Sequence, residues 1–372
     1  MSNSLPRALP GLNVARMPQH LLTATIERIS AAYSREDALR DDIHYWPPPL
    51  PTPDMIHAPD PLVLFLPEQP AISFQRQADE RRSVIPMTMH EILERRSREQ
   101  LKPSMQIPLG LLDKPEILQS NPLLVDLHAA PGGPLLIVGA AHSGKATALQ
   151  TLLFWLVSRF LPEQLRCAII DPLHELDFFQ ELPHLRASDG TLMWTDGSSD
   201  EKLNQFIATF NNEFLRRREA YPYQRWNETT LAQMWSQGLE MPQFLLIISN
   251  YHTFSERTGA ANALKRLALL TAEMRTMGMY LVVSSAEMSM PYLPPELLSI
   301  FATRIGLQLN EQQRFELFGH TPLVSEHVPG RGLIVLPDRA LYQIQLALPL
   351  PGATEHQRYE ALKNELQWLS RY

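Results

Sequence analysis

The stretch Pro134-Leu-Leu-Ile-Val-Gly-Ala-Ala-His-Ser-Gly-Lys-Ala-Thr147 decides how this chain folds. Apolar residues 135–138 predict a buried strand, and the apolar run 148–160 predicts a helix. Between them lies a loop with the spacing Gly-x-x-x-x-Gly-Lys, which binds phosphate when it joins a strand to a helix. The sequence therefore predicts a phosphate- or nucleotide-binding site. Its residues are Gly139, Ala140, Ala141, His142, Ser143, Gly144, Lys145, Ala146 and Thr147.

The chemistry of this loop depends on its backbone and on one lysine. Successive N–H groups point into such a loop and bind phosphate oxygens, and the positive end of the following helix adds attraction. Gly139 and Gly144 allow backbone angles and close approaches that a Cβ atom would block, while Lys145 would bridge the outer phosphates. The alternative is a turn that has kept this sequence but binds nothing.

One position of the motif departs from the pattern. A Ser or Thr normally follows the lysine and places its hydroxyl on Mg²⁺, whereas this chain has Ala146. Thr147 comes one residue later and points about 100° further round the helix, so it is a poor substitute. The sequence therefore gives little support for bound Mg²⁺, and no metal-ligating residue is assigned.

A nucleotide-hydrolysing site also needs acidic side chains at the end of a neighbouring strand, to hold Mg²⁺ and to polarise the attacking water. The candidate strand is Phe244–Ile248, which is followed by Ser249 and Asn250 and by no carboxylate. Asp171, after the predicted strand 167–170, is an alternative acid, although an Asp-Pro turn explains it more simply. Without a base and a held metal, several orders of magnitude in hydrolysis rate are expected to be lost.

Composition narrows the class of protein. The chain has 372 residues, of which 44% are hydrophobic and 20% charged, an ordinary globular balance. A net charge of −7 argues against a strongly basic nucleic-acid binder, although it leaves room for a local basic patch. The only cysteine, Cys167, excludes an internal disulfide and a multi-cysteine metal site. No run of 18 apolar residues occurs, so a cytoplasmic protein without a membrane span is expected.

The chain divides by composition into residues 1–103 and 104–372. More than half of its 32 prolines precede residue 135. The first part should hold a helix at about 17–39, a Pro-rich linker around Tyr45–Pro51 and a charged helical segment. In the second part, strands are expected at 106–112, 122–127, 135–138, 167–170, 244–248, 280–284, 301–309, 332–336 and 340–348, and further helices at 206–221 and 264–274. Strands that alternate with helices predict an α/β fold with a mostly parallel sheet.

An ordered set of segments gives the chain a family resemblance. It resembles an FtsK/SpoIIIE-type ATPase domain, in particular the tandem ATPase domains of the EccC/EssC proteins of type VII secretion. The segments that carry the resemblance are Pro108–Pro115, Pro122–Leu127, Gly139–Lys145, Ile169–Pro172, Phe244–Tyr251, Gly278–Val283, Thr303–Leu307 and Pro329–Gly332. The resemblance implies a RecA-like P-loop NTPase core, ATP at the P-loop, and a ring or tandem assembly in which Arg residues act in trans.

Only some of the functional residues of the family are present at the matching positions of this chain. The two glycines and Lys145 match the Walker A motif of the family, and Ala146 departs from it. Ser249 and Asn250 stand where the acidic Walker B residues would be. Arg275 lies where such domains often carry an Arg, so it is a candidate trans-acting residue. These departures weaken the expectation of catalysis more than the expectation of family membership.

Three functions remain open at this stage. The first is a module that binds ATP with little or no hydrolysis and acts through contacts with other FtsK/SpoIIIE-type ATPase domains, a secretion complex or a helical secreted substrate. The second is an active ATP-driven translocase of polypeptide or DNA, with DNA disfavoured by the acidic balance. The third is a scaffold that binds no nucleotide. A secretion complex would place the chain at the inner face of the membrane.

Overall fold

The computed structural model describes the region that the sequence predicts to be an α/β domain. Its described residues are 105–114, 119–128, 134–187, 189–220, 234, 242–255, 273–286, 293, 298–320, 328–350 and 354–370. The elements predicted within residues 1–103 lie outside this set, and so does most of the helix predicted at 264–274. The division of the chain at residue 103 therefore stays a prediction.

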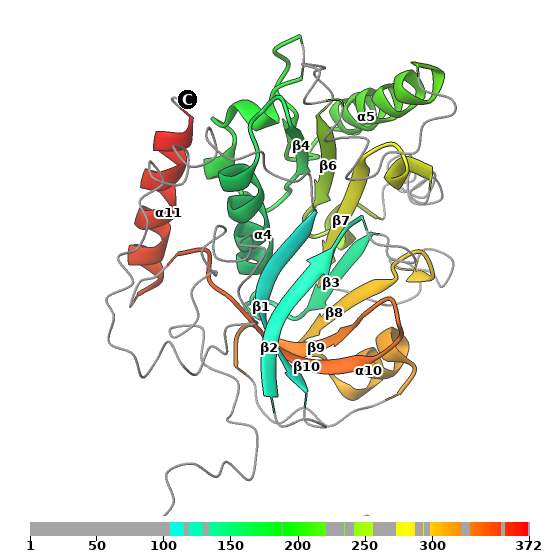
Figure 1. The fold of residues 1–372 in the computed structure, drawn as a ribbon, viewed down its shortest axis with the longest axis vertical. Coiled ribbons are helices and arrows are strands. Elements are labelled where there is room, and N and C mark those ends of the chain that lie inside the picture. The colour runs from blue at the N-terminus through cyan, green and yellow to red at the C-terminus, as the bar shows by residue number, and fades with distance from the viewer. Residues whose placement is uncertain are drawn as a thin grey trace, which may run out of the picture. The chain divides into compact units, whose positions relative to one another are not determined.

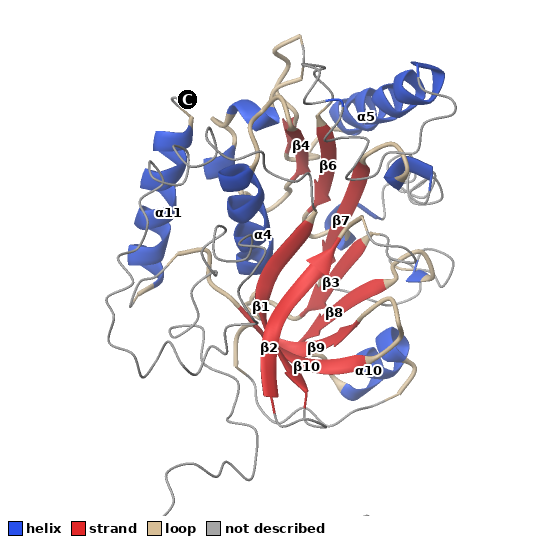
Figure 2. Cartoon of the chain, viewed as in Figure 1, coloured by secondary structure: helices blue, strands red, loops and turns tan. Residues whose placement is uncertain are grey.

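Ten strands in the described part form one sheet, and six of them run parallel. Their order across the sheet is β2-β1-β10-β9-β8-β3-β7-β6-β4-β5 (Figure 1, Figure 2). The strands are β1 (Gln106–Lys114), β2 (Gln119–Asp126), β3 (Leu135–Gly139), β4 (Leu165–Ile170), β5 (Trp194–Thr195), β6 (Gln243–Ile248), β7 (Met279–Ser285), β8 (Thr303–Leu307), β9 (Arg331–Val335) and β10 (Leu341–Leu346). The strands from β8 to β5 pair in parallel, and β9, β10, β1 and β2 extend the sheet with antiparallel pairs. This confirms the mostly parallel α/β sheet that the sequence predicts.

Helices cover both faces of the sheet. The described helices are α4 (Lys145–Arg159), α5 (Asp200–Ala220), α7 (His252–Ser255), α10 (Glu311–Phe318) and α11 (Glu355–Leu369), with short 3₁₀ turns η6 (Asp177–Phe179) and η7 (Pro183–Leu185). Leu135 and Ile137 of β3 belong to the core that includes α4 and α11, which lie on one side of the sheet, whereas Leu136 and Val138 belong to the core of α5 (Figure 1). Successive strand residues point to opposite faces, so β3 must be apolar throughout.

The helices differ from expectation in three places. The helix predicted to begin at residue 206 begins at Asp200, where acidic residues occupy its first turn. Helices α10 and α11 were not predicted, because only a few apolar residues of each are buried. A signal for α10 was nevertheless present. Asn310 Oδ1 accepts from Gln313 N (2.9 Å) and Gln313 Oε1 accepts from Asn310 N (3.1 Å), which forms a capping box. Among the described helices, none combines the length and the apolar character needed to cross a membrane.

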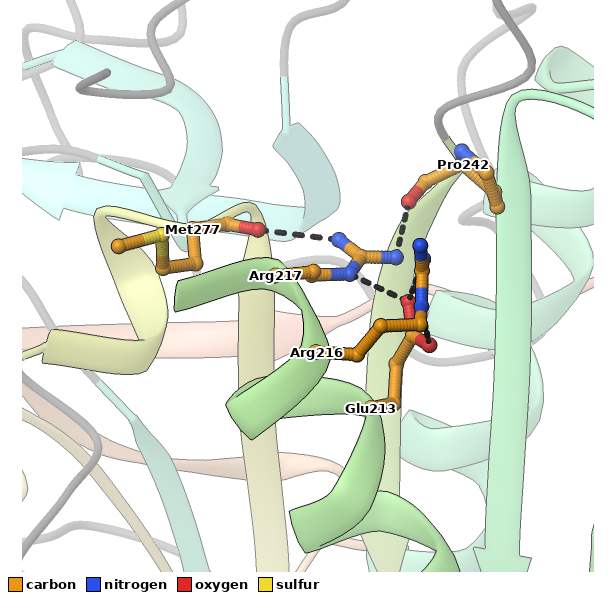
Figure 3. A network of polar contacts seen from close by, with 5 residues as sticks. All are labelled: Glu213, Arg216, Arg217, Pro242 and Met277. Atoms are coloured by element: carbon orange, nitrogen blue, oxygen red, sulfur yellow. Dashed lines mark hydrogen bonds and ion pairs between the residues drawn. The ribbon is translucent and has the colours of Figure 1, made fainter. Parts of the chain in front are cut away.

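A buried arginine fixes the end of α5 to the starts of two central strands (Figure 3). The Arg217 side chain is fully buried and donates from Nε to Glu213 Oε1 (2.6 Å). Its Nη1 donates to the Met277 carbonyl (3.0 Å), just before β7, and its Nη2 to the Pro242 carbonyl (2.7 Å), just before β6. Burial alone would raise the pKa of Glu213, but the hydrogen bonds and charges of Arg216 and Arg217 hold that pKa below its ordinary value.

A second buried polar group shapes the loop after β4. Asp171 is fully buried, and its Oδ2 accepts a hydrogen bond from Leu176 N (2.7 Å). Burial raises the pKa of Asp171 to about 6, against the opposing effect of backbone hydrogen bonds from Leu176 and Glu175. The Asp-Pro turn expected from the sequence is present at residues 171–174. The bond from Leu176 N to the Asp171 carboxyl group closes the loop that contains Glu175.

The Arg217 network makes a stability prediction. We expect Arg217→Met to lower the free energy of unfolding by about 3 kcal/mol, because it removes the buried one of the two arginine partners of Glu213 and leaves the Met277 and Pro242 carbonyls without this donor. Arg216→Met is the matched control: its side chain is 56% exposed, so a loss of less than about 1 kcal/mol is expected. Urea unfolding of the three proteins measures both values. Equal losses in the two variants would contradict the role assigned to Arg217.

The Asp171 carboxyl group predicts how stability depends on pH. Its pKa in the folded chain, about 6, lies above the value of about 3.9 expected for an unfolded chain, so the folded state binds the extra proton between these values. This group therefore costs stability as pH rises from about 4 to 6. Asp171→Asn keeps an acceptor for Leu176 N but cannot titrate. We therefore expect the free energy of unfolding of this variant, relative to wild type, to increase by about 2–3 kcal/mol as pH rises from 4 to 7. Urea unfolding across that range tests it, and a difference that does not change with pH would count against it.

Candidate functional site

The predicted phosphate-binding loop lies at the carboxyl edge of the parallel strands. β3 ends at Gly139 and α4 begins at Lys145, with the loop between them. A Cβ atom at Gly139 would lie 2.5 Å from Ser143 Oγ and 2.7 Å from the Leu307 carbonyl oxygen, which is too close for any other residue. Gly144 has φ of +104°, a left-handed conformation that favours glycine. Both glycines of the motif are therefore needed for the shape of the loop.

Lys145 is held inside the loop that it follows. Its side chain is buried, and Nζ donates hydrogen bonds to the carbonyl oxygens of Gly139 and Ala140, both at 2.8 Å. Burial lowers the pKa of Lys145, while the negative charge of Glu175 acts in the opposite direction. In the same loop, the buried Oγ of Ser143 has no hydrogen-bond partner among the described residues. A buried cation and an unpartnered hydroxyl suit an anionic ligand, so the residues present fit a nucleotide phosphate.

The turn before β9 supports the loop from the other side. Gly330 N donates to the Ser143 carbonyl oxygen (2.8 Å), and a Cβ atom at Gly144 would lie 2.9 Å from Gly330 N. The Gly330 carbonyl in turn accepts from Leu346 N (2.8 Å) of β10. The segment Pro329–Gly332 noted in the sequence thus holds the backbone of the phosphate-binding loop through a direct hydrogen bond and links it to β10.

Ser249 and Asn250 lie at the end of β6, as expected, and are both buried. Ser249 N donates to the Ile170 carbonyl (2.8 Å), and Asn250 N donates to Ser284 Oγ (3.0 Å). Asn250 has φ of +48°, a conformation that Asn tolerates better than most residues. The strand end therefore carries an amide and a hydroxyl where an acidic pair would stand.

A carboxylate nevertheless reaches this position from the neighbouring loop. Glu175 lies between β4 and η6, and its Oε2 accepts hydrogen bonds from Asn250 Nδ2 (2.8 Å) and Ser249 Oγ (3.3 Å). The Glu175 carbonyl also accepts from Gln150 Nε2 (3.1 Å) of α4. The expectation that no acid stands at the end of β6 thus holds for the strand itself but not for the space beside it.

Asp171 does not supply that acid. Its Oδ2 is engaged by Leu176 N, and its Oδ1 is buried without a partner among the described residues. The sequence alone does not single out Glu175, because it is five residues beyond the end of β4. The available signal was topological: β4 and β6 are parallel neighbours, so the loop after β4 emerges beside residues 249–250.

These side chains can be tested against the magnesium ion that the fold implies. Mg²⁺ is usually bound in such sites through one or two carboxylates, substrate phosphates and water. Ala146 offers no oxygen, as predicted from the sequence. Glu175 offers one carboxylate, whose Oε1 accepts no hydrogen bond from the part of the chain that the structure describes. Within that part, no cluster of three His, Cys, Asp or Glu side chains forms a metal cage. The donor set therefore fits a metal that arrives with phosphates and takes one protein carboxylate.

Arg275 lies far from its own phosphate-binding loop along the strand direction. It precedes β7, and β7 runs parallel to β3, so Arg275 is at the edge of the sheet opposite to Gly139–Lys145. Its Nη1 donates to the His128 carbonyl (3.2 Å). The structure therefore does not bring Arg275 together with the other candidate residues, and a role in trans stays a prediction.

Comparison with known proteins agrees with this geometry. A sequence model described as the FtsK/SpoIIIE family matches residues 88–324. The ESX secretion system protein EccC of Geobacillus thermodenitrificans is 24% identical over 264 residues, which cover 70% of this chain and 17% of that protein. The type VII secretion system protein EssC of Staphylococcus aureus is 24% identical over 272 residues (72% and 17%). The DNA translocase FtsK of Brucella melitensis is 23% identical over 252 residues (60% and 30%).

Solved structures show the same fold. EssC (ATPases 2 and 3) from Geobacillus thermodenitrificans has a TM-score of 0.60 at 20% identity and covers 73% of this chain and 50% of that chain. EccC (ATPases 2 and 3) of Thermomonospora curvata, in complex with a signal sequence peptide, has a TM-score of 0.59 at 18% identity and covers 73% and 48%. The chain spans only about a sixth of the length of the two secretion relatives, 17% of each. Because the family model matches more than half of its residues and the P-loop sheet has the expected topology, this chain belongs to the FtsK/SpoIIIE family of P-loop ATPases.

Proposed function

We propose that this domain binds ATP at Gly139–Lys145, hydrolyses it slowly or not at all, and uses nucleotide binding to control contacts with partners. One observation carries the proposal: the phosphate-binding loop is complete, whereas the end of β6 carries Ser249 and Asn250 in place of acidic residues. Lys145 and both glycines keep the geometry of a binding site. Ala146, Ser249 and Asn250 replace three side chains on which hydrolysis depends.

The expected loss of rate follows from the chemistry of phosphoryl transfer. Catalysis of this reaction consists mainly of positioning and of neutralising charge, and little of it is covalent. Removing a single preorganised group from such a site costs on the order of a hundredfold to a thousandfold in rate. Ala146 removes the hydroxyl that would bind the metal, and the side chains of Ser249 and Asn250 cannot act as a general base near neutral pH. Binding depends on the backbone cradle and on Lys145, so binding should survive.

The relatives indicate the class of partner. EccC and EssC are proteins of ESX and type VII secretion systems, and one EccC structure contains a signal sequence peptide. On this basis the domain would work in the cytoplasm at a secretion complex. It would contact other FtsK/SpoIIIE-type ATPase domains or a helical secreted substrate. DNA is the less favoured partner, because a net charge of −7 opposes contact with phosphate backbones.

An active translocase is the second candidate. Glu175 favours it, because this carboxylate stands beside residues 249–250, where an acid is required. FtsK relatives named as DNA translocases extend the same family. The two candidates differ in one measurable quantity, the rate of phosphate release that depends on Lys145.

The proposal predicts binding without turnover. At 100 times its dissociation constant, ATP should stabilise the folded chain by about 2.7 kcal/mol. That stabilisation would raise the melting temperature by several degrees, while phosphate release stays near background. Lys145→Ala should abolish the shift, and Lys202→Ala, which removes an exposed lysine of α5, should leave it intact.

Thermal shift and phosphate release are measured on the same samples, with ATP and ADP. Rapid phosphate release that Lys145→Ala removes would replace the proposal with the translocase candidate. The absence of any shift with either nucleotide would leave only a scaffold that binds none.

A further inference from the structure

The hydrogen bonds of Glu175 suggest that the missing acid has moved and has not simply been lost. In the usual arrangement a carboxylate stands at the end of the strand, and here that position carries two donors, Ser249 Oγ and Asn250 Nδ2. Both donors point at the same oxygen, Oε2 of Glu175. The two donors at the end of β6 therefore hold the Glu175 carboxylate in one orientation, as hydrogen-bond donors around a metal-binding carboxylate do.

The geometry points to Glu175 as the carboxylate that binds the magnesium ion of Mg·ATP in this domain. This inference rests on the proposed function, since it names the form of nucleotide that the same site takes. Glu175 is half-buried, and its Oε1 accepts no hydrogen bond from the described residues, so one oxygen is fixed and the other is open to a ligand. Mg²⁺ commonly takes one carboxylate together with phosphate oxygens and water.

Electrostatics place the same carboxylate beside the phosphate loop. The negative charge of Glu175 acts to raise the pKa of Lys145, against the larger lowering effect of burial. Glu175 is also tied to the helix that follows the loop, because Gln150 of α4 donates to its carbonyl oxygen. A carboxylate so close to a phosphate site would repel unaccompanied ATP, and a bound divalent cation would turn that repulsion into attraction.

The test is ATP affinity with Mg²⁺ and with EDTA, measured by calorimetry or by titration of a fluorescent ATP analogue. In the wild-type chain we expect Mg²⁺ to tighten ATP binding about tenfold or more. Glu175→Gln should bind ATP equally well in both conditions, and in EDTA it should bind at least as tightly as wild type. The matched control is Glu181→Gln, the same substitution at an exposed glutamate in the same segment, and it should behave as wild type.

A second variant tests the exchange of positions directly. In Glu175→Gln combined with Asn250→Asp, the amide and the carboxylate change places, so a strand-end acid is restored and the loop supplies the donor. We expect this double variant to recover the Mg²⁺ enhancement that the single variant loses. Recovery also shows that the single variant failed through its charge and not through misfolding.

Each outcome separates this inference from the function on which it rests. Equal ATP affinity with and without Mg²⁺ in wild type, or an unchanged enhancement in Glu175→Gln, overturns the role of Glu175 and leaves ATP binding in place. Equal weakening of Glu175→Gln in both conditions shows that Glu175 only maintains the shape of the loop, and also overturns it. No ATP binding in either condition removes the proposed function itself.

Discussion

The close approach of two backbone segments, the phosphate-binding loop and the turn before β9, constrains the rest of this domain. Gly330 N donates to the Ser143 carbonyl, and neither Gly144 nor Gly330 could carry an ordinary side chain without a change in conformation. The loop follows the central strand β3, whereas the turn joins the antiparallel extension of the sheet. The extension formed by β9 and β10 therefore does more than widen the sheet. It sets the shape of the loop whose N–H groups would bind phosphate.

The sequence predicts most of the sheet and the first half of the site. Continuous apolar runs such as 244–248 identify strands buried on both faces, and the Gly-Lys spacing identifies the loop, because both signals are local. The helices α10 and α11 escaped prediction because their stability comes from caps and from a few buried leucines. The short β5 has only two residues and gives no pattern at all.

Glu175 illustrates why the second half of the site could not be predicted in the same way. The role of Glu175 depends on its hydrogen bond with Asn250, which is 75 residues away in the sequence. This contact exists because β4 and β6 are neighbours in the sheet. Read along the chain, residues 249–250 indicate a loss of function. In three dimensions, they are donors to a carboxylate from another loop. A degenerate motif is therefore weak grounds for a degenerate site when the missing chemistry can enter from an adjacent strand.

The hydrogen bonds of Lys145 to the carbonyls of Gly139 and Ala140 have a consequence for ligand binding. Because Lys145 Nζ already donates to two carbonyl oxygens, a nucleotide phosphate that binds this lysine must replace them as acceptors. The two carbonyl oxygens of the loop compete with any ligand for the ammonium group of Lys145. A ligand must therefore offer better acceptors than two neutral carbonyl oxygens. Charged phosphate oxygens meet that requirement and neutral molecules do not. These two hydrogen bonds therefore favour a phosphate over a neutral group as a ligand of Lys145.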